Sequence, residues 1–369
     1  MQLRSRRVVI GAAVALLAII VVAGALLIGG FGRPPTASPH ASATPSPSAA
    51  LSPTLAPAAV CPLNGEPLTK ADLAQRPALL VQIENNPEAR PAAGLSLADL
   101  VVEAPVEGDT TRFSAVYLCK PDVGKVGPVR SARYFNVDLW QQIRALTLHF
   151  GAGTKILEAI AAANMPDVNG LTGGWPEFAR IGPRPAPHNV YLDVKAVRAA
   201  IAAGGTLADL AARTGKTRSP FVFGAHGSVP AGTSVGSVSI QTNSFWRFGW
   251  KYDAASQRWS RSDGGERIID PLTKGAVTAR SIMVQIVTET ILVNELDPGG
   301  YPRRLQHLVG SGKGVLYVDG ARHAVRWERR SAADVTTWFY ADSGKPVILP
   351  PGQVWWEIVP TGTRISESP

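Results

Sequence analysis

Arginines are concentrated in a few loops of this sequence, together with glycine, proline, asparagine and histidine. Arg130 and Arg133 lie three positions apart in the segment 127–133, and two further arginines and a histidine lie in the segment 180–191. Guanidinium groups pair well with phosphate and carboxylate because of their fork geometry. The pattern predicts an anion pocket, and the alternative is a structural network in which arginines and glutamates pair with one another. The candidate ligand-binding residues are Asn85, Asn86, Arg112, Arg130, Arg133, Arg180, Arg184, His188 and Asn189.

Carboxylates in the same region offer a different chemistry. Glu84 and Glu107, with Glu103 and Asp109 nearby, could supply a general acid and a general base for glycan cleavage. The sequence does not give the separation of the two carboxyl groups. A cell-wall glycan hydrolase or transferase that uses Glu84 and Glu107 is therefore the alternative function, and whether the protein is an enzyme stays open.

Other catalytic and cofactor motifs are not found. The six histidines show no paired metal-ligand spacing, and no G-x-S-x-G sequence is present. The segment 310–314 (GSGKG) is not a phosphate-binding loop, because Gly314 stands where serine or threonine is needed and a strand follows. We expect no metal, no cofactor and no nucleotide, and we interpret GSGKG as a tight turn between strands.

Strands that alternate with helices are predicted to position the candidate residues. The predicted strands cover 78–84, 101–104, 112–118 and 146–150. The predicted helices follow Thr69, Ser96, Ser131 and Asp193 and cover 154–163. Ligand sites in such layered folds lie outside the carboxyl ends of the strands. We therefore expect the loops 84–86, 103–109, 127–133 and 149–154 to lie close together.

The pattern changes at about residue 216. Seven of the nine tryptophans follow residue 240, and short strands are separated by hairpin turns at 255–256, 319–320 and 342–344. The tryptophans could stack on sugars, but core positions are the favoured interpretation. The predicted fold class is α+β, with an α/β layered domain over 61–215 and a mostly antiparallel β domain over 216–369.

The N-terminal residues predict a membrane anchor and a linker. A basic stub (1–7) precedes a transmembrane signal anchor (8–32), whose apolar run Val8–Ile28 has 21 residues and would span about 31 Å as a helix. A cleaved signal peptide is the alternative. Arginines before the span favour a cytoplasmic N-terminus and an extracytoplasmic globular part. The Pro/Ala/Ser-rich segment 33–60 is predicted to be a disordered linker.

The net charge of +9 does not indicate a nucleic-acid partner. The first 59 residues contain four arginines and no acid, which leaves 33 basic against 28 acidic residues in the remainder. The two cysteines, Cys61 and Cys119, would be either a disulfide, which an extracytoplasmic location permits, or two buried thiols. No cysteine closely follows the apolar run, which disfavours a lipid anchor.

Longer motifs resemble a known family. They include Ile83–Pro91 (IENNPEARP), Gly127–Arg133 (GPVRSAR), Ala186–Tyr191 (APHNVY), Gly310–Gly314 and Gly352–Trp355. Over about residues 61–360 the chain is similar to the YerB-like family of bacterial envelope proteins. The resemblance implies an N-terminal α/β domain packed on a C-terminal β domain outside the cytoplasmic membrane. It implies no activity, because the family has no assigned function.

The favoured hypothesis is a membrane-tethered binding protein whose arginine-lined site holds an anionic envelope component, such as a cell-wall polymer or a lipid-linked phosphate.

Overall fold

The computed structural model describes residues 59–121, 123–225, 228–242 and 247–369. The predicted membrane anchor lies outside these residues, as does the predicted linker except for Ala59 and Val60. Among the described residues, no helix has the length and apolar character needed to cross a bilayer.

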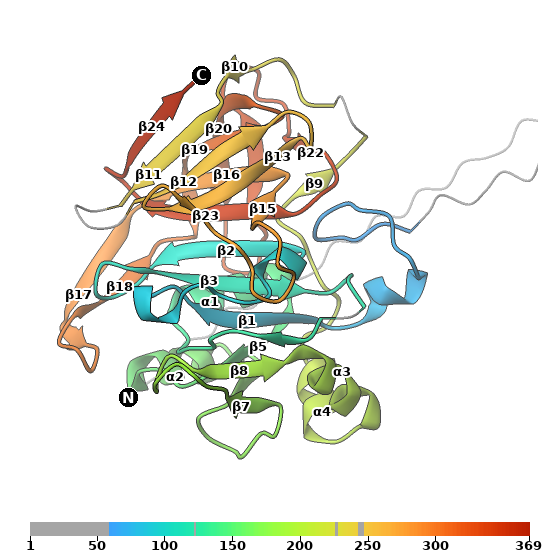
Figure 1. Cartoon of the computed structure of the whole chain (residues 1–369), viewed down its shortest axis with the longest axis vertical. Coiled ribbons are helices and arrows are strands. Elements are labelled where there is room, and N and C mark those ends of the chain that lie inside the picture. The colour runs from blue at the N-terminus through green and yellow to red at the C-terminus, as the bar shows by residue number, and fades with distance from the viewer. Residues whose placement is uncertain (1–58, 122, 226–227, 243–246) are drawn as a thin grey trace, which may run out of the picture. The chain divides into compact units, whose positions relative to one another are not determined.

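An eleven-stranded sheet runs through both halves of the sequence (Figure 1). Its order is β10-β20-β19-β16-β23-β2-β3-β1-β5-β6, with β21 also paired to β20. The halves join where β2 pairs in parallel with β23, so that Val101 is opposite Trp355. The strands contributed by the first half are β1 (Ala78–Glu84), β2 (Leu100–Pro105), β3 (Thr111–Tyr117), β5 (Ala145–His149) and β6 (Asp167–Asn169). Those contributed by the second half are β10 (Thr233–Ser234), β16 (Ser281–Val287), β19 (Gly310–Val318), β20 (Ala321–Arg329), β21 (Thr337–Tyr340) and β23 (Val354–Pro360).

A second, six-stranded sheet packs on one face of the large sheet. It consists of β11 (Ser237–Gln241), β12 (Arg247–Asp253), β13 (Arg258–Asp263), β14 (Glu266–Arg267), β15 (Thr278–Ala279) and β24 (Arg364–Ser368). Because side chains alternate along a strand, Trp355 packs against Trp250 of this second sheet, whereas its neighbour Trp356 packs on the opposite face against Trp338. All four tryptophans are buried, which confirms that they are core residues.

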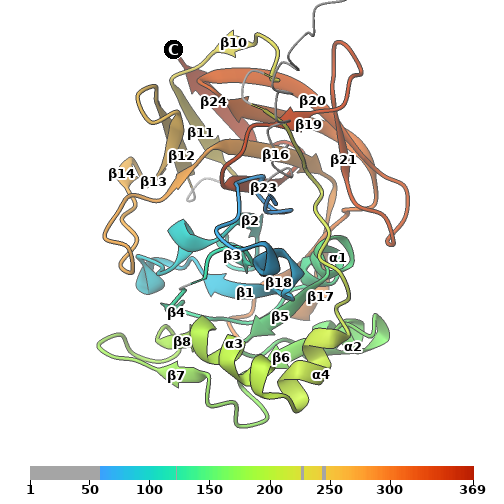
Figure 2. The same ribbon diagram turned by 90° about the vertical axis from the view of Figure 1, so that its right-hand side faces the viewer.

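Helices are fewer than the sequence predicts, so the fold is mostly β. The α-helices among the described residues are α1 (Phe135–Ile143), α2 (Thr154–Ala162), α3 (Val194–Ala203) and α4 (Thr206–Ala212), and the last two lie side by side in Figure 2. The helices predicted after Thr69 and Ser96 are only short 3-10 turns, Ala71–Gln75 and Leu95–Leu97. The first stops before Pro77, which disfavours helical conformation in the preceding residue, and the second is followed closely by β2.

The interpretation of GSGKG as a turn is wrong. Gly310–Gly314 form the first part of β19, paired with β16 and β20. A Cβ atom on Gly314 would lie 2.5 Å from the carbonyl oxygen of Val284, so glycine allows the neighbouring strand to approach closely. The hairpin turns predicted at 255–256 and 319–320 are confirmed, between β12 and β13 and between β19 and β20.

Smaller strand pairs complete the fold. They are β4 (Lys125–Val126) with β8 (Val190–Asp193) and β7 (Phe178–Arg180), β9 (Val222–Phe223) with β22 (Ile348–Leu349), and β17 (Glu289–Leu296) with β18 (Pro302–Gln306). We call the β17–β18 hairpin, residues 289–306, the arm. It belongs to the second half of the sequence and extends along the strands of the first half in Figure 1.

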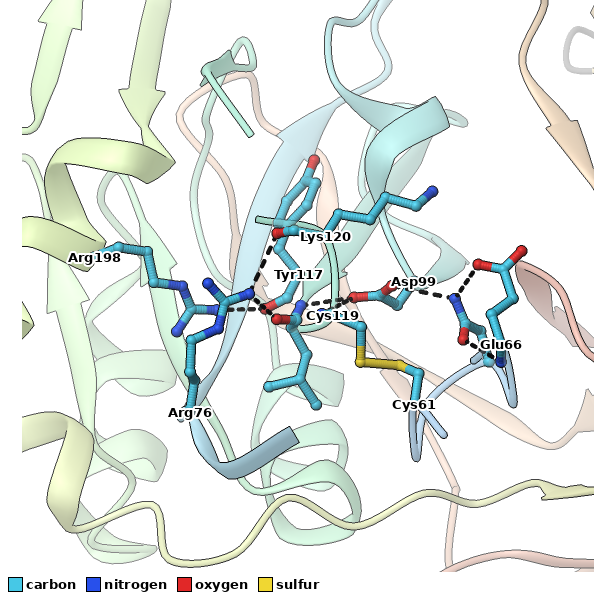
Figure 3. The surroundings of a disulfide bond; sticks show 10 residues. Cys61, Glu66, Arg76, Asp99, Tyr117, Cys119, Lys120 and Arg198 are labelled. Carbon is cyan, nitrogen blue, oxygen red and sulfur yellow. Dashed lines mark hydrogen bonds between the residues drawn. A yellow bond between two sulfur atoms is a disulfide. The ribbon is translucent and has the colours of Figure 1, made fainter. Parts of the chain in front are cut away.

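A disulfide joins Cys61 to Cys119, as one of the two predicted alternatives requires (Figure 3). The buried Asp99 lies beside it and accepts hydrogen bonds from the backbone N–H groups of Leu118 and Cys119 and from the side chain of Asn64. This network fixes the first described residues to the end of β3.

Candidate functional site

Two buried glutamates at one edge of the large sheet are each held by arginines. Glu84, at the end of β1, has its Oε1 atom 3.0 Å from Arg130 Nε, 3.8 Å from Arg112 Nη1 and 3.1 Å from His188 Nδ1. Its side chain is fully buried. Glu84 therefore connects three of the candidate ligand-binding residues.

Glu107 is the second of these glutamates. Its carboxylate receives Arg133 Nε at 2.6 Å and Arg303 Nη1 at 3.0 Å. Burial alone would raise the pKa of Glu107, but the two arginines outweigh it, and the pKa lies below its ordinary value. Glu107 is thus held as a carboxylate, which does not suit the general-acid role in the alternative function.

We call Arg112, Arg130, Arg133 and Arg303 the arginine cluster. Strand pairing places Arg112 next to Glu84, because Glu84 of β1 is directly opposite Arg112 of β3. The backbone of Arg130 then bridges the ends of two strands: its N–H donates to Gln82 of β1, and its carbonyl accepts from Phe150, which follows β5. The sequence predicts that the loops after these strands converge at one edge of the sheet. This expectation is met for the candidate residues Arg112, Arg130 and Arg133.

Arg303 was not singled out from the sequence. It lies in β18 of the arm, 196 positions from Glu107, its carboxylate partner. Its guanidinium group also lies against the backbone at the start of α2, since a Cβ atom on Gly153 would be 2.8 Å from Arg303 Nη2. The arm therefore completes a cluster that otherwise belongs to the first half of the sequence.

Arg112 is 3% exposed, and its Nε and Nη1 atoms have no hydrogen-bond partner among the described residues. Burial, followed by the positive charge of Arg133, lowers the pKa of the Arg112 guanidinium to about 9. A buried cation without hydrogen bonds is costly. The four arginines of the cluster and their two partners, Glu84 and Glu107, together carry an excess of two positive charges.

The start of α2 adds backbone donors next to Arg303. The helix begins at Thr154, and its N-cap residue, Gly153, has no side chain to cap the first N–H groups. His149 shapes the preceding turn, since its two ring nitrogens lie 2.8 Å from the Gly151 carbonyl and 2.8 Å from Asp167 Oδ2.

Six of the nine candidate residues lie outside the arginine cluster: Asn85, Asn86, Arg180, Arg184, His188 and Asn189. Arg180 donates to Asn189, while Arg184 donates to the hydroxyl of Tyr191 and to the carbonyl of Pro91. These contacts hold the segment 180–191 in place and position His188, which does reach Glu84. Asn86 has a buried amide oxygen without a hydrogen-bond partner among the described residues.

Asn85 belongs to a neighbouring buried network. Its amide donates to Glu103 and Thr111, and Glu103 in turn accepts from Arg261 Nη2 at 2.9 Å. Arg261 is fully buried, with its guanidinium carbon 4.0 Å from the ring centroid of Phe248. This network spans the two sheets.

Glu357 of β23 completes this network, with its Oε1 atom 3.2 Å from Trp250 Nε1 and 3.9 Å from Arg261 Nη1. Burial, followed by the negative charge of Glu103, raises the pKa of Glu357 well above its ordinary value. Sequence reasoning missed Arg261 and Glu357, although each has a signal: a charged residue two positions from a tryptophan, Trp259 or Trp355, on the inward face of a strand.

Two hollows lie beside these networks, and both are lined by Arg90. One has a volume of about 630 Å³ and is also lined by Thr110, Arg247 and Tyr301. The other has a volume of about 370 Å³ and is also lined by Phe113. The arginine cluster itself reaches solvent mainly through Arg130, whose side chain is 25% exposed.

The two halves of the chain match the two parts of one protein family. A family model described as "Protein of unknown function (DUF3048) N-terminal domain" matches residues 63–206, and the corresponding C-terminal model matches residues 237–356. The chain belongs to this family, which confirms the resemblance noted from the sequence.

Among individual proteins, the chain is similar to YerB. It is 30% identical over 298 residues to "Putative lipoprotein YerB" of Bacillus subtilis (strain 168), covering 79% of this chain and 84% of that protein. The crystal structure of the YerB protein from Bacillus subtilis superposes with a TM-score of 0.68 at 27% identity, covering 83% of this chain and 99% of that one.

Proposed function

We propose that this protein is a membrane-tethered, extracytoplasmic binding protein of the bacterial cell envelope, and that its arginine cluster holds an anionic ligand such as a cell-wall polymer or a lipid-linked phosphate. The observation that carries the proposal is the excess of positive charge around Arg112, whose buried N–H groups have no hydrogen-bond partner within the described part of the chain. A bound anion would supply both the missing charge and the missing acceptors.

The similarity to a protein named as a lipoprotein supports the envelope location. The anchor we propose here is the apolar run Val8–Ile28 rather than a lipid. The first cysteine of the chain is Cys61, and its sulfur is bonded to Cys119, so it is not available for lipidation. Arg4, Arg6 and Arg7 precede the apolar run and favour a cytoplasmic N-terminus.

This anchor predicts that the protein fractionates with membranes and that protease added outside the cell removes the globular part. Deleting residues 8–28 should abolish membrane association. If instead the mature protein lacks the apolar run when its N-terminus is sequenced, a cleaved signal peptide replaces the anchor.

Ligand binding is tested with a matched pair of double variants. Arg130→Ala with Arg133→Ala removes two members of the arginine cluster. Arg330→Ala with Lys345→Ala removes the same charge from exposed positions outside it. We expect the first variant to lose at least tenfold in affinity for purified anionic wall polymer in a co-sedimentation assay, and the second to bind like the parent.

Circular dichroism and thermal unfolding establish that both variants are folded. Equal losses in the two variants would mean that binding follows net charge alone and not the arginine cluster. Undiminished binding by a folded Arg130→Ala, Arg133→Ala variant would refute the proposed function.

A further inference from the structure

The net charge of the arginine cluster and its hydrogen-bond donors define the chemistry of the ligand more closely. Its side chains are 4%, 25%, 9% and 8% exposed for Arg112, Arg130, Arg133 and Arg303, so the excess of two positive charges is mostly removed from water. Uncompensated charges in such surroundings cost several kcal/mol each. A ligand with two negative charges would neutralise the cluster, whereas one with a single charge would leave half of the excess.

The available donors outnumber what a carboxylate can use. Arg130 donates to Glu84 only through its Nε, and Arg303 donates to Glu107 only through its Nη1. The other guanidinium N–H groups of these two arginines have no described acceptor. Arg112 adds two partnerless nitrogen atoms, and the uncapped first turn of α2 lies beside Arg303. A carboxylate presents two oxygens, and a phosphodiester presents two free oxygens with one charge. A phosphate monoester presents three oxygens and close to two charges at pH 7.

We propose that the arginine cluster binds a terminal phosphate monoester as its dianion, and that Arg303 of the arm provides the selectivity for the second charge. This inference rests on the proposed function and narrows its ligand. Arg303 is placed for this role because it brings a further positive charge to the start of α2 and is held there by Glu107.

Binding of small probes to the full-length protein in detergent tests the inference. At pH 8, methyl phosphate is a dianion, whereas dimethyl phosphate and acetate are monoanions. Isothermal titration calorimetry should give methyl phosphate an affinity at least tenfold higher than either monoanion. Arg303→Gln should remove most of this preference, and Arg330→Gln, at an exposed arginine paired with Glu328, should leave it unchanged.

Glucose 1-phosphate and detergent-solubilised phosphatidic acid distinguish the two sources of a monoester, a soluble sugar phosphate and a lipid headgroup. Detergent-solubilised phosphatidylglycerol, a phosphodiester, is the matched control. Binding of either monoester source in preference to the diester supports the inference. Arg303→Gln leaves Glu107 with one arginine. Arg130→Gln, at the more exposed position, therefore serves as a second variant in the same binding measurements.

Equal affinity for methyl phosphate and dimethyl phosphate would overturn the monoester inference. Binding of wall polymer that depends on Arg130 and Arg133, without any binding of methyl phosphate, would also overturn it while leaving the proposed function in place. If neither wall polymer nor methyl phosphate nor the lipids bind, both the monoester inference and the proposed function are refuted.

Discussion

The buried pair Glu103 and Glu357 shares one arginine, Arg261, between two carboxyl groups. The raised pKa of Glu357 means that the folded protein keeps a proton that the unfolded chain releases above about pH 4.5. The stability that this proton provides is complete below that pH and is lost as the pH rises toward the pKa of the folded state.

Glu357→Gln should therefore flatten the dependence of stability on pH. Glutamine keeps an acceptor for Trp250 and a donor for Glu103, as protonated Glu357 does, but has no proton to lose. We expect the variant to exceed the parent in free energy of unfolding at pH 8 and to differ less at pH 5, as measured by urea denaturation. Glu328→Gln, at a carboxylate on the surface, is the control, and an unchanged pH profile in Glu357→Gln would contradict the assignment.

Arg112 and Arg261 are both buried, but they have different partners. Replacing each of them with methionine should therefore affect the free energy of unfolding differently. Arg261→Met removes the arginine that donates to Glu103, so we expect a loss of about 3–5 kcal/mol in the free energy of unfolding. Arg112→Met leaves Glu84 with Arg130 and His188 and removes an arginine whose Nε and Nη1 atoms have no described hydrogen-bond partner, so stability in phosphate-free buffer should not fall. The same variant should lose the stabilisation that methyl phosphate gives the parent. Denaturant titrations with and without the anion measure both effects.

At the scale of elements, the arm is held to the first half of the sequence by polar contacts, which include Arg303 with Glu107, Tyr134 with Glu295 and Gln306 with the carbonyl of Pro105. Arg304 pairs with Glu289 within the arm, at 2.7 Å, and with Asp109 outside it, at 3.2 Å. Arg304→Ala should speed hydrogen exchange of the amides in β17 and β18 and leave those of β1 unchanged, because β1 is central in the large sheet. Unchanged exchange in the arm would mean that its other contacts, including Arg303 with Glu107, suffice to hold it.

Strand β19 depends on glycine for its place between two neighbours. Gly314→Ala would bring a Cβ atom against the Val284 carbonyl in the middle of the sheet, and we expect a loss of about 1–3 kcal/mol. Gly182→Ala adds the same atom in open space and should be nearly neutral. Thermal unfolding of the two variants makes the comparison, and similar melting temperatures would contradict the packing argument.

Several strands and the hairpins at 255–256 and 319–320 were predictable because their signals are local. Alternation predicted β1 and β3, and their adjacent ends then placed Glu84 near Arg112. Distant pairing was not predictable: neither Arg303 nor Arg261 lies in a loop typical of a binding site, and each meets its glutamate partner only because a separate sheet packs against the large one. For the same reason, the sequence did not indicate that a single sheet runs through both halves.

At the scale of the whole molecule, the disulfide should be a major source of stability. Cys61 and Cys119 are 58 positions apart, and closing a loop of that length in the unfolded chain corresponds to about 4 kcal/mol. Cys61→Ser with Cys119→Ser should lower the melting temperature, and dithiothreitol should lower that of the parent to a similar value. A parent that is insensitive to reduction while its thiols are shown to be free would contradict this account.

The disulfide also determines how the protein bears a mechanical load. A pull applied through the residues before Val60 passes from Cys61 directly to Cys119 and so bypasses the intervening loop, which contains β1, β2 and β3. These strands hold Glu84 and Arg112, so tension applied along the chain between its two ends would not extend this part of the site. In a single-molecule pulling experiment, the oxidised protein should therefore show an unfolding extension shorter by the length of that loop than the reduced protein.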